Sequence, residues 1–316
     1  DDGIGMDEEI IKTSLQFGNG TRLKSRKGIG RFGIGLPNAS ISQCNKVEVY
    51  SWRNSECLYT YLDIREVEKK EQQEINDIVK KELPEFLKKE TKSKNGTAVV
   101  WTDCDRLDIA RAETLFSRMS KDLCRIFRHF LDNDDDYGKK VSIRYKISGS
   151  QNEQELLAND PLYLMIPNNC PGYKNEPVME LKTKDNDPRE GKISIAFNDP
   201  ITNEPKVSDV LFRFSSTKKN IRDKEADTSN EFMNHLKRNI GISFVRAGRE
   251  VDFGVFGFFT MYSTVDRWWG CEVRFEPELD EVFGVTNDKQ MIRGMGPLTP
   301  EIKDNLEITD EDVKND

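Results

Sequence analysis

The chain opens on Asp1-Asp2-Gly3-Ile4-Gly5-Met6, and Gly28-Ile29-Gly30-Arg31-Phe32-Gly33-Ile34-Gly35 follows a short distance later. A third stretch, Asn95-Gly96-Thr97, leads directly into the apolar residues Ala98-Val99-Val100-Trp101. The chain thus carries an acidic D-x-G-x-G turn, then G-x-x-G-x-G, then a Gly-Thr pair before a strand. In this order the three stretches are the set of parts that builds one nucleotide pocket.

Each end of such a pocket needs a particular residue type. A carboxylate such as Asp1 can accept a hydrogen bond from the exocyclic amine of adenine. Gly3 and Gly5 allow the backbone to turn tightly beside the base, because glycine tolerates positive φ and has no Cβ. Thr97 offers a hydroxyl that can reach the same carboxylate, directly or through water.

The second glycine stretch is suited to phosphate. Gly30, Gly33 and Gly35 expose backbone N–H groups at the start of the predicted helix 36–44, where the helix dipole favours negative charge. Gly28, Gly30 and Gly33 also spell the dinucleotide fingerprint G-x-G-x-x-G, but that motif should follow an apolar strand, and the polar, basic run 21–27 precedes it here. A purely structural glycine loop is a further alternative, and it leaves Asp1 and Thr97 unexplained.

Together the motifs resemble the GHKL ATPases, which include gyrase B, the ninety-kilodalton heat-shock chaperone, MutL-type mismatch-repair proteins and CheA-type histidine kinases. The sequences of these motifs are most similar to those of the microrchidia, topoisomerase VI B and chaperone branches. The resemblance implies an α+β protein: a two-layer α/β sandwich, the Bergerat ATP-binding fold, followed by an S5-like α+β transducer domain.

The resemblance also assigns roles to residues of this sequence. It implies that Asp1 holds adenine, that Gly30, Gly33 and Gly35 hinge a lid over the phosphates, and that Thr97 is the threonine of the Gly-Thr motif. The residues expected to bind ATP are Asp1, Gly3, Gly5, Met6, Thr21, Arg22, Lys24, Gly30, Phe32, Gly33, Ile34, Gly35, Leu36 and Thr97. For the three polar residues of the lid, which spans 17–29, simple solvation is the alternative to phosphate binding.

The expected cofactors are ATP and Mg²⁺. In the family, a helix before the first motif carries a glutamate that activates water and an asparagine that binds magnesium. Neither can be located in this sequence, which begins at the motif aspartate without an initiator Met. We therefore expect the chain to be a fragment, with no metal ligand among its own residues.

A lysine of the transducer domain reaches the γ-phosphate in related proteins, because a compact ammonium on a flexible stem can neutralise developing charge. The polar loop 277–290 ends in Asn287-Asp288-Lys289-Gln290, which is similar to loops of the microrchidia type. Lys289 is therefore the predicted catalytic residue, with Gln290 assisting and Arg293 as a fallback. The alternative is an exposed loop lysine, which is the usual state of lysine.

Composition sets outer limits on the protein. At 316 residues, with 36% hydrophobic and 33% charged residues, the chain is long enough for two surface-charged globular domains. No apolar run approaches a membrane span and no secretory signal is present, so we expect a cytoplasmic protein. The six cysteines are scattered without zinc spacing, which favours reduced core residues. A net charge of −8 argues against general nucleic-acid affinity without excluding a local basic patch.

Hydrophobic periodicity and turn-forming residues predict the organisation of the chain. The polar break at 132–138 predicts an ATP-binding domain over 1–131, whose N-terminal part is absent, a transducer domain over 139–300, and an acidic tail over 301–316. Helices are expected at 7–17, 36–44, 65–92 with a break at Pro84, 107–131, and 229–239 with Ser229 as its cap. Strands are expected at 47–52, 57–64, 97–102, 141–147, 162–166, 193–197, 210–214, 242–245, 253–261 and 269–275. The two histidines, His129 and His235, lack the context of a catalytic or phospho-accepting residue and are interpreted as structural.

The implied function is a slow ATPase that acts as a switch: ATP closes the lid and promotes dimerisation, and hydrolysis releases the clamp. Its client is either DNA or a protein partner. The alternatives are a chaperone-like, signalling or defence module that recruits a separate effector, and a nucleotide-binding module that no longer hydrolyses ATP.

Overall fold

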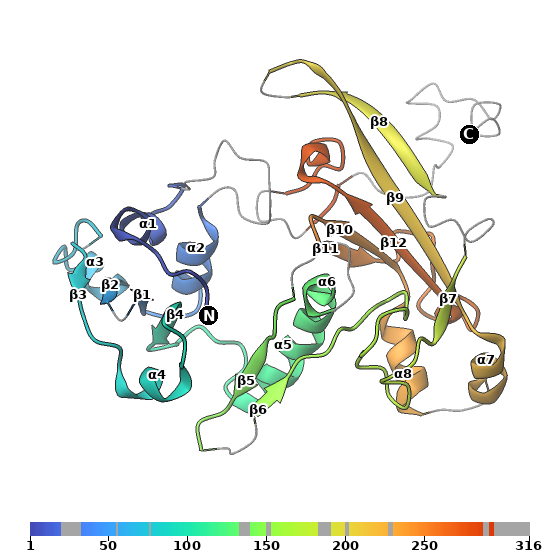
Figure 1. The fold of residues 1–316 in the computed structure, drawn as a ribbon, viewed down its shortest axis with the longest axis horizontal. Coiled ribbons are helices and arrows are strands. Elements are labelled where there is room, and N and C mark those ends of the chain that lie inside the picture. The colour runs from blue at the N-terminus through green and yellow to red at the C-terminus, as the bar shows by residue number, and fades with distance from the viewer. Residues whose placement is uncertain are drawn as a thin grey trace. The chain divides into compact units, whose positions relative to one another are not determined.

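The computed structural model describes residues 1–19, 33–54, 56–75, 77–132, 140–149, 153–182, 191–199, 202–226, 230–286 and 291–293. These residues form an α+β protein of two compact units, Asp1–Ala112 and Glu113–Asp316 (Figure 1). The division falls at the first residue of the long helix α5 (Ala112–Ile126), whereas the polar break at 132–138 predicted it after that helix. The roles assigned to the two predicted domains stay predictions.

A four-stranded antiparallel sheet is the framework of the first unit. Its order is β3 (Val79–Lys80), β2 (Glu56–Asp63), β1 (Lys46–Arg53) and β4 (Asn95–Thr102). The strands expected at 47–52, 57–64 and 97–102 are confirmed. In the central pair, Ser51 lies opposite Thr97, which fixes the register of β1 against β4.

Two short helices pack on this sheet, α1 (Glu8–Ser14) and α2 (Gly35–Ile41) (Figure 1). Asp7 starts α1 as its N-cap, because its side chain accepts a hydrogen bond from the Ile10 backbone at 2.9 Å. Ile11 and Leu15 follow at helical spacing and are buried against strand residues such as Val49. Both helices agree with the sequence prediction and are shorter than predicted.

The helix predicted over 65–92, with a break at Pro84, is wrong before that proline. The segment forms α3 (Ile64–Glu68), then the strand β3, then α4 (Glu85–Glu90). After α3 the chain turns, and the buried Gln72 side chain accepts from the Asp63 backbone nitrogen at 3.1 Å. Pro84 stands at the N-cap of α4, so the break predicted at this proline is confirmed.

The second unit contains a larger mixed sheet (Figure 1). Its strands are β7 (Met179–Leu181), β8 (Lys192–Asn198), β9 (Pro205–Thr217), β10 (Ile242–Arg246), β11 (Arg249–Gly254) and β12 (Trp269–Phe275). The order is β11-β10-β12-β9-β7, with β8 also paired to β9, and only the β10–β12 pair among these is parallel. A separate antiparallel pair is formed by β5 (Arg144–Lys146) and β6 (Glu153–Glu155).

The helices of this unit are α5, α6 (Arg128–Leu131), α7 (Lys219–Glu225) and α8 (Glu231–Arg238), together with the 3₁₀ turns η2 (Asp266–Trp268) and η3 (Pro277–Leu279). The helix predicted over 107–131 therefore starts later and is interrupted at Phe127. Asn230 caps α8 by accepting from the Met233 backbone at 2.9 Å, so the cap assigned to Ser229, which lies outside the described residues, is corrected.

Two predicted strands are wrong, both because polar side chains hold turns. Over 162–166, the Asp160 carboxylate accepts from the backbone of Leu162 at 3.0 Å and of Leu164 at 2.8 Å, which closes a turn. The strand expected over 253–261 ends with β11 at residue 254, and the Asp266 carboxylate then accepts from the Thr260 backbone at 2.7 Å. Periodicity alone did not indicate either turn.

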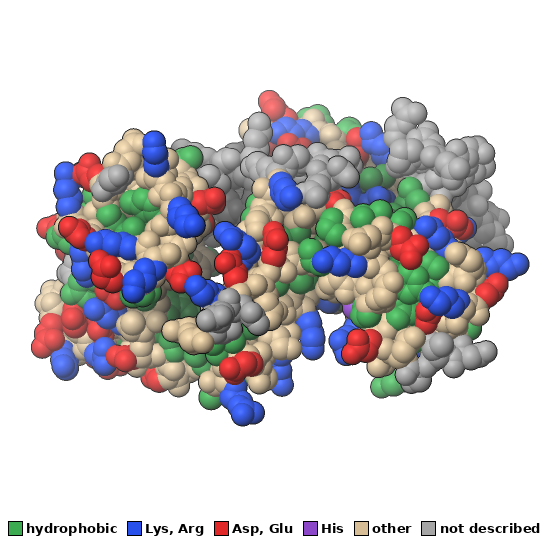
Figure 2. Space-filling view, turned by 60° about the horizontal axis from the view of Figure 1, so that its bottom comes forward, with side chains coloured by type: hydrophobic (Ala, Val, Ile, Leu, Met, Phe, Trp, Pro, Cys, Tyr) green, Lys and Arg blue, Asp and Glu red, His purple; other side chains and the backbone are tan. Residues whose placement is uncertain are grey.

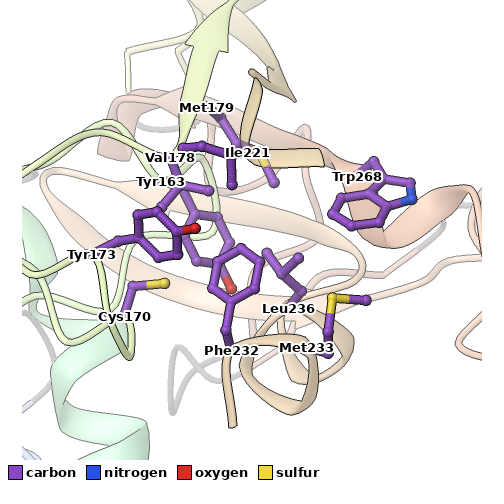
Figure 3. Packing of buried hydrophobic residues seen from close by; sticks show 10 residues of the cluster. All are labelled: Tyr163, Cys170, Tyr173, Val178, Met179, Ile221, Phe232, Met233, Leu236 and Trp268. Atoms are coloured by element: carbon purple, nitrogen blue, oxygen red, sulfur yellow. The ribbon is translucent and has the colours of Figure 1, made fainter. Parts of the chain in front are cut away.

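The buried residues shown in Figure 3 form one core of this unit. They come from β7, α7, α8, η2 and the turn-rich segment before β7: Tyr163, Cys170, Tyr173, Val178, Met179, Ile221, Phe232, Met233, Leu236 and Trp268. His235 adjoins this core, with Nδ1 2.8 Å from the Tyr163 hydroxyl and Nε2 3.0 Å from Asn169. Burial, with a smaller contribution from Arg238, lowers the pKa of His235 to about 4, so it is a neutral structural residue.

An ionic network joins α5 and α6 to the larger sheet. The fully buried Arg128 guanidinium donates to Glu250 at 2.9 Å, to Glu272 at 2.7 Å and to Ser243 at 2.5 Å. His129, also fully buried, lies 2.9 Å from the same Glu272 oxygen. His129 is thus part of the interior, and His235 lies half-buried beside the core, in agreement with their structural interpretation.

The prediction of reduced core cysteines holds for Cys44, Cys124, Cys170 and Cys271, which are buried free thiols. It is wrong for Cys104, which is exposed, and Cys57 is only partly buried. Burial raises the pKa of the Cys124 thiol to about 11 and of the Cys170 thiol to about 12, which makes both unreactive. None of the helices in the described part of the chain is long and apolar enough to cross a membrane.

Candidate nucleotide-binding site

Asp1 lies beside β4, and its backbone pairs with that of Thr97, 96 positions further along the chain. The Asp1 nitrogen donates to the Thr97 carbonyl at 2.7 Å, and the Thr97 N–H donates back to the Asp1 carbonyl at 3.1 Å. Two residues that exchange both bonds form a directly opposed antiparallel pair, whose side chains share a face. The fold therefore brings together the two residues expected at the adenine end of the pocket.

The turn after Asp1 is fixed by its carboxylate and by a glycine. Asp1 Oδ1 accepts a hydrogen bond from the Gly3 N–H at 3.0 Å, while the Asp1 side chain stays exposed and accessible to a ligand. Gly5 has φ +72°, and a Cβ there would lie 2.5 Å from the Trp52 carbonyl oxygen. Gly5 is therefore required by both its conformation and its close approach to β1.

Ser51 of β1 connects the first motif with the Gly-Thr motif. Its fully buried hydroxyl accepts from the Met6 backbone N–H at 2.7 Å, donates to the Gly96 carbonyl at 3.2 Å, and lies 3.1 Å from the Thr97 hydroxyl. At Gly96 a Cβ would lie 2.4 Å from both the Asp1 carbonyl oxygen and the Trp52 ring. Only glycine therefore allows the first motif to approach β4 this closely.

The described part of the second motif leads into α2. Gly33 has φ +64°, Gly35 is the first residue of the helix, and Leu36 packs on the sheet core. Further along α2, the Ser40 hydroxyl accepts from the Trp101 indole of β4 at 2.9 Å. This contact ties the helix to the strand that carries the Gly-Thr motif.

Several predicted site residues lie outside the described residues. They are Thr21, Arg22, Lys24, Gly30 and Phe32 of the predicted lid and phosphate loop, and Lys289 and Gln290 of the predicted catalytic loop.

The residues that flank Lys289 and Gln290 are joined to each other. The Thr286 N–H donates to the Met291 carbonyl at 3.1 Å, which brings the two flanks together. The Asp252 carboxylate of β11 accepts from the Ile292 N–H at 2.9 Å and fixes this junction to the sheet. Arg246 of β10 and Asp280 form a buried ion pair, with Arg246 Nη2 2.8 Å from the Asp280 carboxylate.

Magnesium does not have a ready site among these residues. No group of three or more His, Cys, Asp or Glu side chains suited to a metal ion occurs within the part of the chain that the structure describes. The residues present therefore do not by themselves build a magnesium site, and the metal remains a prediction of the resemblance.

Sequence reasoning missed Ser51. The available signal was weak: Ser51 takes the inward position that follows Val47 and Val49 in a strand of alternating pattern, where an apolar side chain is the usual choice. A polar residue at such a position needs a partner, but the sequence does not say which one.

Residues 1–97 match the model of the family described as histidine kinase-, DNA gyrase B-, and HSP90-like ATPases. This N-terminal segment, which holds Asp1, the glycine motif and Thr97, is therefore similar to the GHKL-type ATPases. No curated protein sequence matches the chain.

Solved structures show a looser similarity over the whole chain. One is the N-terminal domain of a DNA repair protein, at 12% identity and a TM-score of 0.45, covering 100% of this chain and 83% of the other. The gyrase B-subunit from Myxococcus xanthus has 9% identity and a TM-score of 0.42, covering 97% and 77%. The 43K ATPase domain of Thermus thermophilus gyrase B, solved with an aminocoumarin, has 11% identity and a TM-score of 0.38, covering 99% and 75%. With TM-scores below 0.5, these likenesses do not establish a common fold.

Proposed function

We propose that this protein binds and slowly hydrolyses ATP and uses the nucleotide as a conformational switch. The observation that carries the proposal is the pairing of Asp1 with Thr97, because it places an accessible carboxylate and a hydroxyl at one end of a glycine-lined turn. The family match over residues 1–97 supports a nucleotide as the ligand.

In this proposal Asp1 accepts a hydrogen bond from the adenine amine, and Gly3, Gly5 and Met6 form the turn beside the base. Gly33, Ile34, Gly35 and Leu36, with the lid residues before them, hold the phosphates.

Lys289, assisted by Gln290, would stabilise the γ-phosphate charge, as the resemblance implies. Bound ATP would then favour a closed, dimeric state, and hydrolysis would release it.

Two kinds of client fit the proposal, DNA and a protein. On the face in Figure 2, basic and acidic side chains are interspersed over the described residues, which agrees with the net charge of −8. On that face the described residues form no broad basic surface of the kind that DNA attracts. A protein client, as in a chaperone-like or signalling module, is therefore kept as the second candidate. DNA affinity that falls steeply with salt would decide for the DNA client.

ATP binding and steady-state hydrolysis by the full-length protein test the proposal, with Asp1→Asn and Lys289→Ala alongside the wild type. We expect Asp1→Asn to lose binding by about tenfold or more, since a charged acceptor is replaced by an amide. Lys289→Ala should keep binding and lose turnover by about 100-fold, as for other groups that stabilise developing charge. Wild-type protein that binds no ATP in the presence of Mg²⁺ would refute the proposal, and binding without turnover would reduce it to a nucleotide-binding module.

A further inference from the structure

The Ser51 hydroxyl has a complete set of hydrogen-bond partners, and counting donors assigns its proton. A serine hydroxyl has one proton and two lone pairs. The Met6 N–H, at 2.7 Å, occupies one lone pair, and the proton goes to the Gly96 carbonyl at 3.2 Å, which can only accept. In the remaining contact, at 3.1 Å, Thr97 is therefore the donor and Ser51 the acceptor.

This assignment decides what Thr97 can offer to a ligand. Its only side-chain proton is used by Ser51, so the Thr97 oxygen presents lone pairs. The neighbouring Asp1 carboxylate is also an acceptor when ionised, and its side chain is exposed. Asp1 and Thr97 are a directly opposed pair, so the two acceptors lie on one face of the sheet.

Two adjacent acceptors select a ligand edge that carries donors. A purine with an amino group at position 6 supplies two N–H donors there, whereas a 6-oxopurine presents a carbonyl oxygen that would face acceptors without a proton between them. An unpaired polar contact of this kind is what makes a hydrogen-bonding site reject an analogue.

We propose that Ser51 is a specificity-determining residue: by taking the Thr97 proton, it makes the Asp1–Thr97 pair select 6-aminopurine over 6-oxopurine nucleotides. This inference rests on the proposed nucleotide site and adds the residue that sets its base preference. Ser51 acts through Thr97, since its own hydroxyl is fully buried and fully bonded.

A role in packing alone would look different. If Ser51 only linked the first motif to β4, its loss would weaken the binding of every nucleotide by the same factor. If it also orients the Thr97 hydroxyl, Ser51→Ala frees the Thr97 proton to rotate toward a 6-oxo group. The preference between two bases then changes, and not only the affinity.

The test measures dissociation constants for ATP and inosine triphosphate by calorimetry on the full-length protein. These ligands differ in the group at position 6 and in the proton on the adjacent ring nitrogen. The variants are Ser51→Ala, Thr97→Val and the double substitution. We expect the wild type to bind ATP more tightly than inosine triphosphate. In Ser51→Ala the ratio of the two dissociation constants should fall about tenfold, the effect of one exchanged hydrogen bond.

In the Thr97→Val background, Ser51→Ala should leave the preference unchanged, because the effect passes through the Thr97 hydroxyl. The matched control is Thr60→Val, on the same sheet. Thr60 is buried, and its hydroxyl has no hydrogen-bond partner among the described residues, so the binding of both nucleotides should stay as in the wild type.

Three results would overturn the proposal. An ATP preference in Ser51→Ala equal to the wild type, with ATP still bound, overturns this inference and leaves the proposed function standing. If Ser51→Ala changes the preference for ATP by the same factor in the Thr97→Val background as in the wild type, Thr97 is not the intermediary. Wild-type protein that binds neither nucleotide overturns the proposed function and this inference with it.

A second measurement keeps the test decisive if Ser51→Ala loses affinity for both ligands. Amide hydrogen exchange at Met6, without nucleotide, should be slow in the wild type and in Thr97→Val, and faster in Ser51→Ala. Unchanged protection of Met6 in Ser51→Ala would contradict the hydrogen bond on which the donor count depends.

Discussion

Arg128→Met is expected to destabilise the second unit by about 3 kcal/mol. Removing one partner of a buried ion pair costs roughly 3–5 kcal/mol, because the remaining charge stays buried. The lower end applies here, since neither carboxylate is left alone. Glu272 keeps Arg274 at 2.5 Å and Arg213 at 3.1 Å, and Glu250 keeps Arg125 at 2.6 Å.

Urea unfolding followed by tryptophan fluorescence measures this cost. With a slope of about 3 kcal/mol per molar urea, reasonable for a unit of this size, the midpoint should fall by about 1 M. Arg144→Met is the matched control, because the Arg144–Glu153 pair at 2.8 Å is exposed on both sides. An exposed pair contributes about 1 kcal/mol or less, so its midpoint should move by about 0.3 M at most.

The same network predicts a pH dependence. Burial alone would raise the pKa of Glu272, but His129, Arg274 and Arg128 hold it well below its ordinary value. A carboxyl whose pKa is lowered by folding stabilises the folded state at pH values above its unfolded-state pKa of about 4.3. This contribution is lost as the pH falls toward the pKa of the folded state. The difference in free energy of unfolding between wild type and Arg128→Met should therefore become smaller below about pH 4. A midpoint for Arg128→Met within about 0.3 M of the wild type at pH 7 would refute the reasoning.

Two further predictions concern other parts of the chain. Because the pKa of His235 is lowered to about 4, the unfolded state binds its proton first, and the free energy of unfolding should fall by about 3 kcal/mol from pH 6.5 to pH 4. Urea titrations at several pH values in this range measure the free energy of unfolding, and in His235→Gln it should fall less steeply with falling pH by this amount. The same pH dependence in His235→Gln and wild type would contradict the assignment. Gly96→Ala should weaken ATP binding by about tenfold or more, because its Cβ would lie 2.4 Å from the Asp1 carbonyl oxygen and from the Trp52 ring. Gly172→Ala in the second unit is the comparison: its Cβ would meet nothing within 4 Å, although its φ of +79° strains alanine. Calorimetry that finds the ATP affinity of the two variants alike would show that the close approach at Gly96 is not needed.

Local sequence patterns were sufficient for the first unit where an element is set by its own neighbours. The alternation over Val47 to Trp52 and the spacing of Ile11 and Leu15 predicted a strand and a helix that both form. The same logic failed over 65–92, since that segment forms a short helix, a strand and a second helix joined by irregular stretches. Contacts with the sheet, such as those of Gln72, override a weak local preference.

The sequence by itself determined the chemistry of the candidate site: an acidic residue, glycines where the backbone must turn, and a hydroxyl before a strand. Only the tertiary structure decided which groups meet. Ser51 contacts Met6 from 45 positions away and Thr97 from 46, and nothing near Ser51 in the sequence encodes either partner. The direction of the Thr97 proton depends on the whole set of donors and acceptors around one oxygen, and that set exists only after the sheet has formed.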